Sequence, residues 1–118
     1  MKKFMAVYIG KPAAFEAFQK KFPSEEARKA QEKKGIEAWH QWNKTNAGAI
    51  VDIGAPLGKT KSVSASGISD TRNALTGYTI VKAESYEAAA KLFLNHPHFN
   101  LFPGDSVEIM ECLPIPGM

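Results

Sequence analysis

Residues 77–113, GYTIVKAESYEAAAKLFLNHPHFNLFPGDSVEIMECL, decide the fold. The β-prone run over 77–83 predicts a strand, and Ser85, followed two positions later by an acidic residue, is typical of a helix N-terminus. Pro97 ends this predicted helix, because the residue before a proline is displaced from helical geometry. The run over 107–113 predicts a second strand. A strand, a helix and a strand in this order indicate a crossover unit that packs on a sheet.

The first half of the chain predicts a matching unit. Residues 4–9 form a continuous β-prone run of the kind found in central strands. Residues 12–23 form either a short amphipathic helix or an insertion, and a long helix is expected between Ser24 and Ala47. The periodicity of the long helix predicts a stripe that faces the sheet, consisting of Ile36, Trp39, His40, Asn43 and Ala47.

The middle of the chain predicts a hairpin near one edge of the sheet. Residues 49–53 have the pattern of a short strand, 54–58 that of a turn, and 61–66 that of a polar strand with alternating side chains. Residues 67–75 are expected to form a loop.

These elements give the order β-α-β-β-β-α-β. Both helices then cover one face of a mainly antiparallel sheet, which predicts an α+β sandwich with ferredoxin-like topology in a single domain, 1–118. Residues 114–118 are expected to form a flexible tail. The other face of the sheet is left open and apolar, so we expect a homodimer that buries it.

The composition is that of an ordinary globular protein. Of 118 residues, 44% are hydrophobic and 23% are charged, which suits one domain with a single core. The net charge of +3 is spread too thinly for a nucleic-acid surface, which requires clustered basic residues. No apolar stretch is long enough to span a membrane. The single cysteine, Cys112, excludes an internal disulfide and fits a reducing compartment, so we expect a cytoplasmic protein.

Several short motifs, taken in order, resemble the YCII-related proteins. They are Tyr8-Ile9-Gly10, Trp39 and Trp42 on a helix that ends at Gly48, residues 52–58 (DIGAPLG), 75–80 (LTGYTI) and 85–89 (SYEAA), His96-Pro97, and Val107-Glu108-Ile109. The resemblance covers most of the chain, with residues 12–23 matching least. It implies a dimeric α/β barrel made from two ferredoxin-like subunits. Some members of the family are suspected to use a histidine and an aspartate as an acid/base pair.

Two departures from the family pattern concern that acid/base pair. Relatives often carry Asp-Gly-Pro-Phe before the late central strand, where this chain reads Ser66-Gly67-Ile68-Ser69-Asp70. Some relatives place an aspartate immediately before the proline that follows the second helix, where this chain has His96. The pair is therefore not carried over, and any acid/base role must rest on this chain's own residues.

The three histidines are the leading candidates for chemistry. His96 and His98 flank a proline and either face a cleft at the helix end or, in the case of His96, neutralise the exposed helix carbonyls. They offer two imidazoles, but no spacing indicates a third ligand, so no metal is predicted. His40 is either a hydrogen-bonded core residue or a pocket residue opposite Tyr8 or Tyr78.

Four further residues are candidates for a pocket. Asp52, at the end of a short strand, could orient a histidine. Asp70 and Arg72 lie in the predicted loop, where the arginine could bind a carboxylate by a bidentate pair, unless both are ordinary solvated charges. One of the two tryptophans, with Trp39 as the candidate, lies at a pocket mouth or a dimer contact, unless both only pack in the core.

These patterns predict a small homodimer with a pocket between sheet and helices that binds an unidentified small organic ligand and needs no cofactor. If the protein is an enzyme, we expect acid/base chemistry, with His40 or His96 as proton carrier and Asp52 or Asp70 as orienting partner. The alternative is a non-catalytic ligand-binding or protein-interaction module in which the same histidines are structural.

Overall fold

The structure is a computed structural model that describes residues 1–117. The helices and strands of this part of the chain are β1 (Lys2–Ile9), α1 (Pro12–Lys21), α2 (Glu25–Thr45), β2 (Ile50–Pro56), β3 (Thr60–Ser64), β4 (Gly67–Thr71), β5 (Leu75–Ala83), α3 (Tyr86–Lys91), α4 (Pro97–Asn100) and β6 (Ser106–Glu111).

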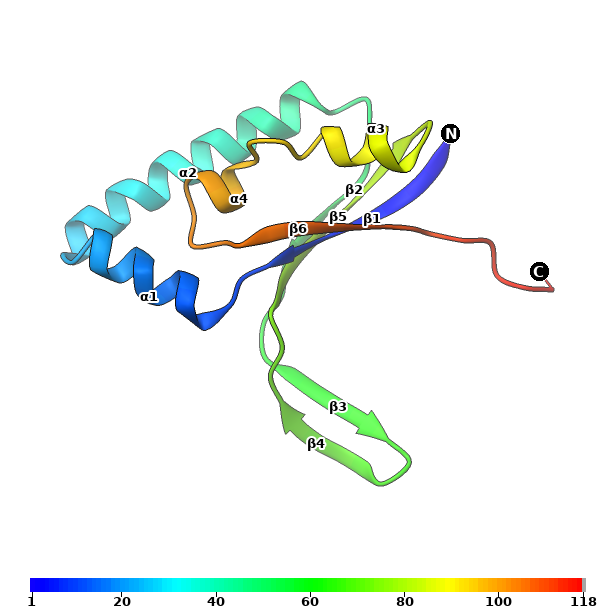
Figure 1. Cartoon of the computed structure of the whole chain (residues 1–118), viewed down its shortest axis with the longest axis horizontal. Coiled ribbons are helices and arrows are strands. Elements are labelled where there is room, and N and C mark those ends of the chain that lie inside the picture. Colours follow the sequence, from blue (N-terminus) through cyan, green and yellow to red (C-terminus); the bar gives the residue numbers. More distant parts are fainter. Residues whose placement is uncertain (118) are drawn as a thin grey trace.

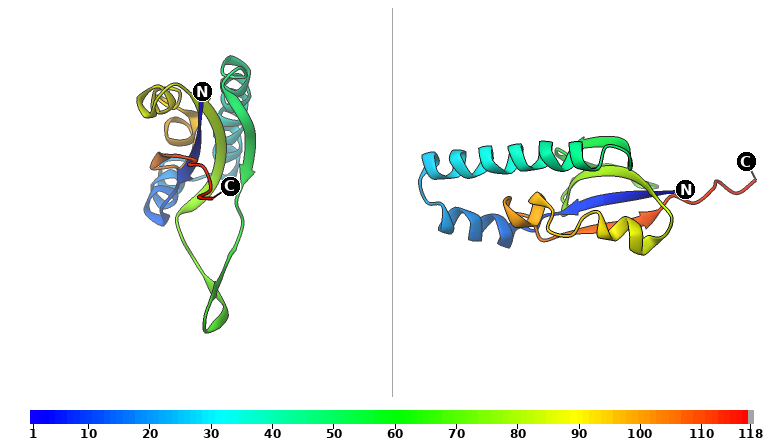
Figure 2. Two further views of the ribbon diagram at one scale, coloured as in Figure 1. Left: turned by 90° about the vertical axis from the view of Figure 1, so that its right-hand side faces the viewer. Right: turned by 90° about the horizontal axis from the view of Figure 1, so that it is seen from above.

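Four strands form one antiparallel sheet in the order β2-β5-β1-β6. Strand β1 lies between β5 and β6, as its continuous apolar run predicts for a central strand. Helices α2, α3 and α4 lie on one side of the sheet (Figure 1). Seen from above, α2 runs alongside α3 and α4 (Figure 2). This topology is ferredoxin-like, which confirms the predicted α+β sandwich.

The core lies between the sheet and this helical layer. Phe4 on β1 and Val81 on β5 are opposite each other and fully buried. Ala89 from α3 and Phe93 from the turn after it belong to the same buried cluster. Tyr8 lies on the same face of β1 as Phe4, because side chains two or four residues apart on a strand point to one side. Burial of these side chains is the main favourable term in folding.

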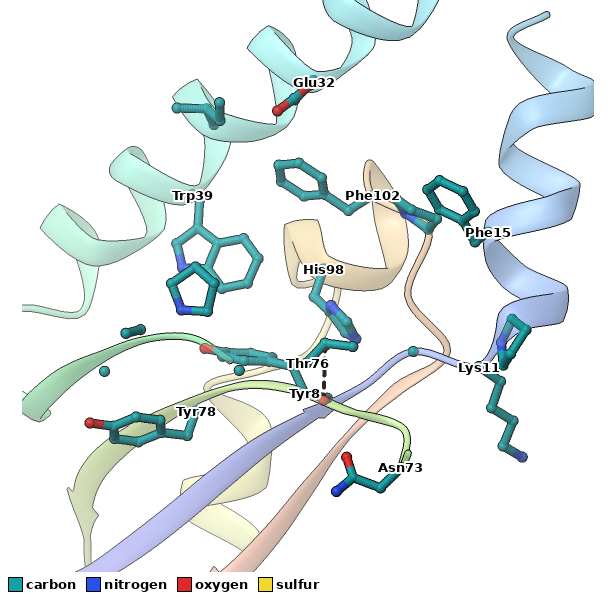
Figure 3. Close-up of a pocket in the computed structure, with 18 of the residues that line it drawn as sticks. Tyr8, Lys11, Phe15, Glu32, Trp39, Asn73, Thr76, Tyr78, His98 and Phe102 are labelled. Carbon is teal, nitrogen blue, oxygen red and sulfur yellow. Dashed lines mark hydrogen bonds between the residues drawn. The ribbon is translucent and has the colours of Figure 1, made fainter. Parts of the chain in front are cut away.

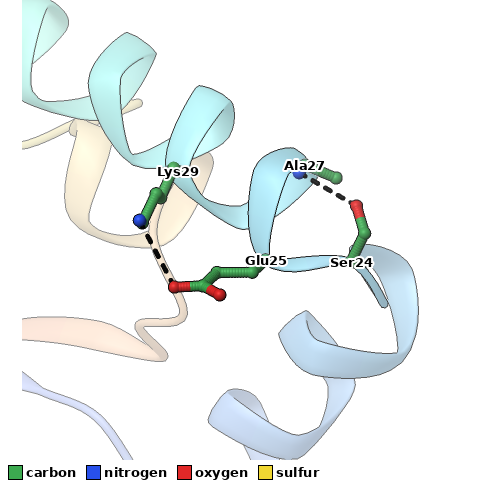
Figure 4. A network of polar contacts seen from close by, with 4 residues as sticks. All are labelled: Ser24, Glu25, Ala27 and Lys29. Carbon is green, nitrogen blue, oxygen red and sulfur yellow. Dashed lines mark hydrogen bonds and ion pairs between the residues drawn. The ribbon is translucent and has the colours of Figure 1, made fainter.

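Both predicted serine caps are confirmed. The Ser24 hydroxyl accepts a hydrogen bond from the Ala27 backbone N–H at 3.0 Å, and Glu25 pairs with Lys29 one turn along the helix (Figure 4). The Ser85 hydroxyl caps α3 in the same way. Each cap satisfies a backbone donor that has no partner within the helix, and so fixes where the helix begins.

The predicted end of the helix that begins after Ser85 is wrong. Helix α3 ends at Lys91, and Asn95 adopts a left-handed backbone conformation with φ of 57°. Pro97 then begins α4, where its missing N–H costs nothing, instead of ending α3. His96 is the N-cap of α4, so it does not neutralise the carbonyl end of a preceding helix.

The predicted hairpin joins the wrong strands. Strand β3 pairs with β4 and not with β2, and the two form a separate sheet that projects from the body of the molecule (Figure 1). Residues 67–71 are β4 and not loop, and the turn expected at 54–58 lies largely within β2. The two short polar strands are joined by a tight turn and form backbone hydrogen bonds with each other. Because this pairing does not require apolar side chains, the hydrophobic pattern of the sequence does not reveal it.

The inward face of α2 matches the predicted stripe only in part. Ile36 is 45% exposed because it borders a cavity between the helix and the sheet. Gly35 is buried and Trp39 and Trp42 are half-buried, whereas His40 is exposed. The two tryptophans have the largest apolar surfaces on the helix, so they decide which side packs on the sheet. The prediction that His40 faces the sheet is therefore wrong.

The remaining parts of the described chain are helix α1 and the C-terminal segment. Residues 12–23, expected as a helix or an insertion, form helix α1 as far as Lys21. Residues 112–117 contain no helix or strand, and Met118, the last residue of the expected tail, lies outside the described residues. Among residues 1–117, no helix combines the length and the hydropathy that a bilayer span requires.

Candidate functional site

A cavity of about 860 Å³ lies between the sheet and helices α1 and α2. Four aromatic rings from different parts of the fold form much of its wall (Figure 3). Tyr8 comes from β1, Phe15 from α1, Trp39 from α2, and Phe102 from the segment after α4. The Trp39 ring makes edge-to-face contacts with Tyr8 and Phe102, at centroid distances of 4.9 and 5.8 Å.

His98 is a buried imidazole in this wall and is only 6% exposed. Its Nε2 lies 2.8 Å from the carbonyl oxygen of Ile9, and since a carbonyl only accepts, Nε2 carries the proton and Nδ1 does not. Burial lowers the pKa of His98, against the opposing effect of the Ile9 and Ser106 carbonyls and the Asp105 carboxylate. The ring is therefore neutral at pH 7.

Gly104 and His96 hold His98 in place. A Cβ on Gly104 would lie 2.4 Å from both Cε1 and Nε2 of His98, so only the missing side chain leaves room for the imidazole. Nδ1 of His96 accepts a hydrogen bond from the His98 backbone N–H at 3.0 Å. The ring and the backbone of His98 are thus both fixed by the segments around them.

His96 itself is fully buried behind the wall. The rings of Trp39 and Trp42 lie 4.5 and 4.6 Å from its centroid, and its Nε2 has no hydrogen-bond partner within residues 1–117. Burial, with a smaller effect from His98, lowers the pKa of His96 to about 3. His96 therefore supports the wall as a neutral group.

The hydroxyl groups of Tyr8 and Thr76 use their protons within the protein. Thr79 donates to the Ile53 carbonyl at 3.1 Å, so the Tyr8 hydroxyl, 2.7 Å from the Thr79 oxygen, is the donor of that contact. Thr76 donates to the Tyr8 carbonyl at 3.0 Å (Figure 3). Burial also raises the pKa of Tyr8 to about 12, so this phenol stays protonated.

The structure brings most of the predicted ligand-binding residues to this cavity. The predicted residues that line the cavity are Tyr8, Trp39, Arg72, Tyr78 and His98. Tyr78 pairs with Val7 across the sheet, and its ring points away from the cavity (Figure 3).

The remaining predicted residues do not meet there. His40 is exposed, and the exposed Asp52 accepts a backbone N–H two residues along its own strand at 2.9 Å. Asp70 pairs with Lys61 on the β3–β4 hairpin. Because His96 is sealed behind the tryptophans, no pair of these histidines and aspartates forms the predicted acid/base arrangement.

Several cavity residues were not predicted. Phe15 lies in the segment 12–23, for which only a helix or an insertion was expected, and Phe102 lies outside the predicted helices and strands. Thr76 belongs to the motif 75–80 but was assigned no role. In residues 1–117, no three histidine, cysteine, aspartate or glutamate side chains lie close enough together to hold a metal ion.

The fold and the cavity define a small ferredoxin-like α+β protein with an apolar pocket between sheet and helices. Among solved structures, it is similar to TftG, a 5-chloro-2-hydroxyhydroquinone dehydrochlorinase from Burkholderia phenoliruptrix AC1100, in complex with 2,5-dihydroxybenzoquinone. The TM-score is 0.51 at 13% sequence identity, and the match covers 92% of this chain and 90% of that chain. This likeness shows the fold alone. No family model matches the chain, and no curated protein does.

Proposed function

We propose that this protein binds a small, largely apolar organic molecule in the cavity between sheet and helices. The observation that carries the proposal is the wall, in which rings from four segments and one neutral imidazole surround about 860 Å³. Ligand pockets typically measure roughly 300–1,000 Å³ and combine apolar walls with a few polar groups. TftG, which shares the fold, holds a small organic molecule in its complex, and this also supports the proposal.

His98 takes the place of His40 and His96 as the candidate proton acceptor. It lines the cavity, it is neutral at pH 7, and its Nδ1 is unprotonated. A catalytic protein would use this nitrogen as a general base, and a non-catalytic one would use it only to accept a hydrogen bond from the ligand. Binding in the cavity is common to both functions.

We also propose that the protein is YCII-related and forms a homodimer through the open face of the sheet. The motifs that resemble the family lie on the ferredoxin-like core. The centre of the sheet face opposite the helices is apolar, because Met5 pairs with Ile80 and Met110 there and Val7 pairs with Tyr78. Glu108 pairs with Val7 on the other side.

Titration with N-phenylnaphthylamine, an uncharged aromatic probe whose emission rises in apolar surroundings, tests the binding proposal. We expect saturable binding of one probe per chain. Ile36→Trp places a larger side chain in the cavity lining, and we expect it to weaken binding by about tenfold or more. The matched control is Leu94→Trp, at a position that is 69% exposed and does not line the cavity. Equal binding by the two variants would contradict the proposal.

A further inference from the structure

Three polar side chains of the cavity lining use their donors within the protein. The Tyr8 hydroxyl donates to Thr79, and the Thr76 hydroxyl donates to the Tyr8 carbonyl. Asn73 uses both ends of its side-chain amide within the chain. These three side chains leave no free proton for a ligand, so a ligand that uses the acceptor on His98 brings a donor of its own.

Nδ1 of His98 is the acceptor best placed for such a donor. The other ring nitrogen is engaged with the Ile9 carbonyl, which fixes the tautomer and leaves a lone pair on Nδ1. Within residues 1–117, Nδ1 is not among the buried side-chain atoms that lack a hydrogen-bond partner. His98 lines the cavity, so a ligand held there lies beside this ring.

The charged residues around the cavity do not favour an ionic ligand. The Lys11 side chain points away from the cavity (Figure 3), and Arg72 and Glu32 are exposed and of opposite sign. An ion inside the aromatic wall would lose its hydration without gaining a buried partner of opposite charge. A carboxylate would also have no proton to donate to Nδ1.

We propose that the ligand is a planar hydroxylated aromatic molecule, of the phenol or naphthol class, whose O–H donates to Nδ1 of His98. Its ring lies among Tyr8, Trp39 and Phe102, which supply edge and face contacts. The hydroxyl supplies the one directional contact and so sets the orientation of the ring. This inference rests on the proposed function, because it requires the cavity to be the binding site.

Three probes that share one ring system test the inference. Naphthol carries the donor, methoxynaphthalene substituted at the same carbon lacks it, and naphthoate is an anion without it. By calorimetry at pH 7 we expect naphthol to bind about tenfold more tightly than methoxynaphthalene, the factor that one hydrogen bond supplies, and naphthoate to bind most weakly. Equal binding of naphthol and methoxynaphthalene, or tightest binding of naphthoate, would overturn the inference.

His98→Phe keeps a ring of similar size and removes the acceptor. The Ile9 carbonyl still accepts the Asp105 N–H at 2.9 Å in this variant, so it is not left without a partner. We expect the variant to bind naphthol as weakly as methoxynaphthalene, with the affinity for methoxynaphthalene unchanged. A variant that keeps the preference for naphthol contradicts the role of Nδ1.

A measurement on the unmodified protein covers the case in which His98→Phe fails to fold. In ¹⁵N-labelled protein, the Nδ1 resonance of His98 should shift on addition of naphthol and not of methoxynaphthalene. No difference between the two probes would overturn the inference.

The Ile36→Trp variant separates this inference from the proposed function. If Ile36→Trp abolishes binding of naphthol and methoxynaphthalene alike, and both bind the unmodified protein equally, the cavity is the site and only the ligand class is wrong. If no probe binds, or Ile36→Trp changes nothing, the proposed function itself fails.

Discussion

His96 is a neutral, fully buried imidazole among tryptophan rings, and this makes the fold sensitive to acid. Its pKa is lowered to about 3 in the folded protein, whereas an unfolded histidine has a pKa of about 6.5. Between these values the unfolded chain binds a proton that the folded chain does not. The contribution of His96 to the free energy of unfolding is therefore fully present above a pH of about 6.5 and is lost as the pH falls toward 3. The lowered pKa of His98 acts in the same direction.

We predict that the free energy of unfolding falls by about 2 kcal/mol between pH 7.5 and pH 5.0 through His96 alone. Urea titrations at a series of pH values measure this change. His96→Asn is the matched variant, because asparagine also accepts the capping hydrogen bond but does not titrate. A pH dependence that is as steep in His96→Asn as in the unmodified protein would show that His96 is not its source.

At this scale the sequence indicated which residue types matter but not how they are arranged. Tyr8 and Trp39 were predicted as pocket residues and do line the cavity. The sequence favoured His96 over His98 as proton carrier, whereas His98 lines the cavity and His96 does not. The difference arises because His98 is oriented by the Ile9 carbonyl, 89 positions away in the chain. No local pattern carries information about such a contact.

Among the elements, α2 shapes the cavity through a glycine. A Cβ on Gly35 would lie 2.5 Å from the Phe102 ring, so the absence of a side chain lets this ring pack directly on the helix. Alanine is favoured over glycine within a helix by about 1 kcal/mol. The two effects oppose each other, and the Phe102 ring can turn aside to relieve the contact.

We predict that Gly35→Ala changes the free energy of unfolding by less than about 1 kcal/mol but weakens binding of N-phenylnaphthylamine several-fold, because the displaced Phe102 ring alters the wall. Thermal unfolding and probe titration measure the two effects. Gly48→Ala is the control, since a Cβ there meets nothing within 4 Å. In a Phe102→Ala background the Gly35 substitution should have no further effect on binding, and a persistent effect would show that it acts by another route.

At the scale of elements, the sequence predicts most where the signal is local. The strands at 4–9 and 77–83 and the helix starts at Ser24 and Ser85 were predicted from apolar runs and capping residues, and the structure confirms them. The end of α3 was missed because Pro97 can begin a helix as well as end one. The pairing of β3 with β4 was missed because pairing of polar strands depends on the backbone.

For the whole molecule, the open sheet face is the surface that the fold leaves unpartnered. Met5 pairs with Ile80 on one side and with Met110 on the other, which gives a continuous apolar row across three strands. Met110 is 44% exposed. The described chain places its helices over the opposite face (Figure 1). Association of two copies through this face would remove the row from water, at a gain of about 25 cal/mol for each Å² of apolar surface buried.

We predict that the protein sediments at twice its chain mass of 12.9 kDa and that Met110→Lys shifts it toward the monomer. Lysine at this position would bury a charge in the dimer interface. An acidic residue is not used, because Glu108 lies two residues away on the same face and already carries a negative charge. Leu94→Lys changes a residue that is 69% exposed in the turn after α3, so it should leave the mass unchanged. Sedimentation equilibrium over a range of concentrations distinguishes the outcomes. A dimer that survives Met110→Lys but not Leu94→Lys would place the interface on the helical layer, and a monomer in the unmodified protein would rule out the dimer.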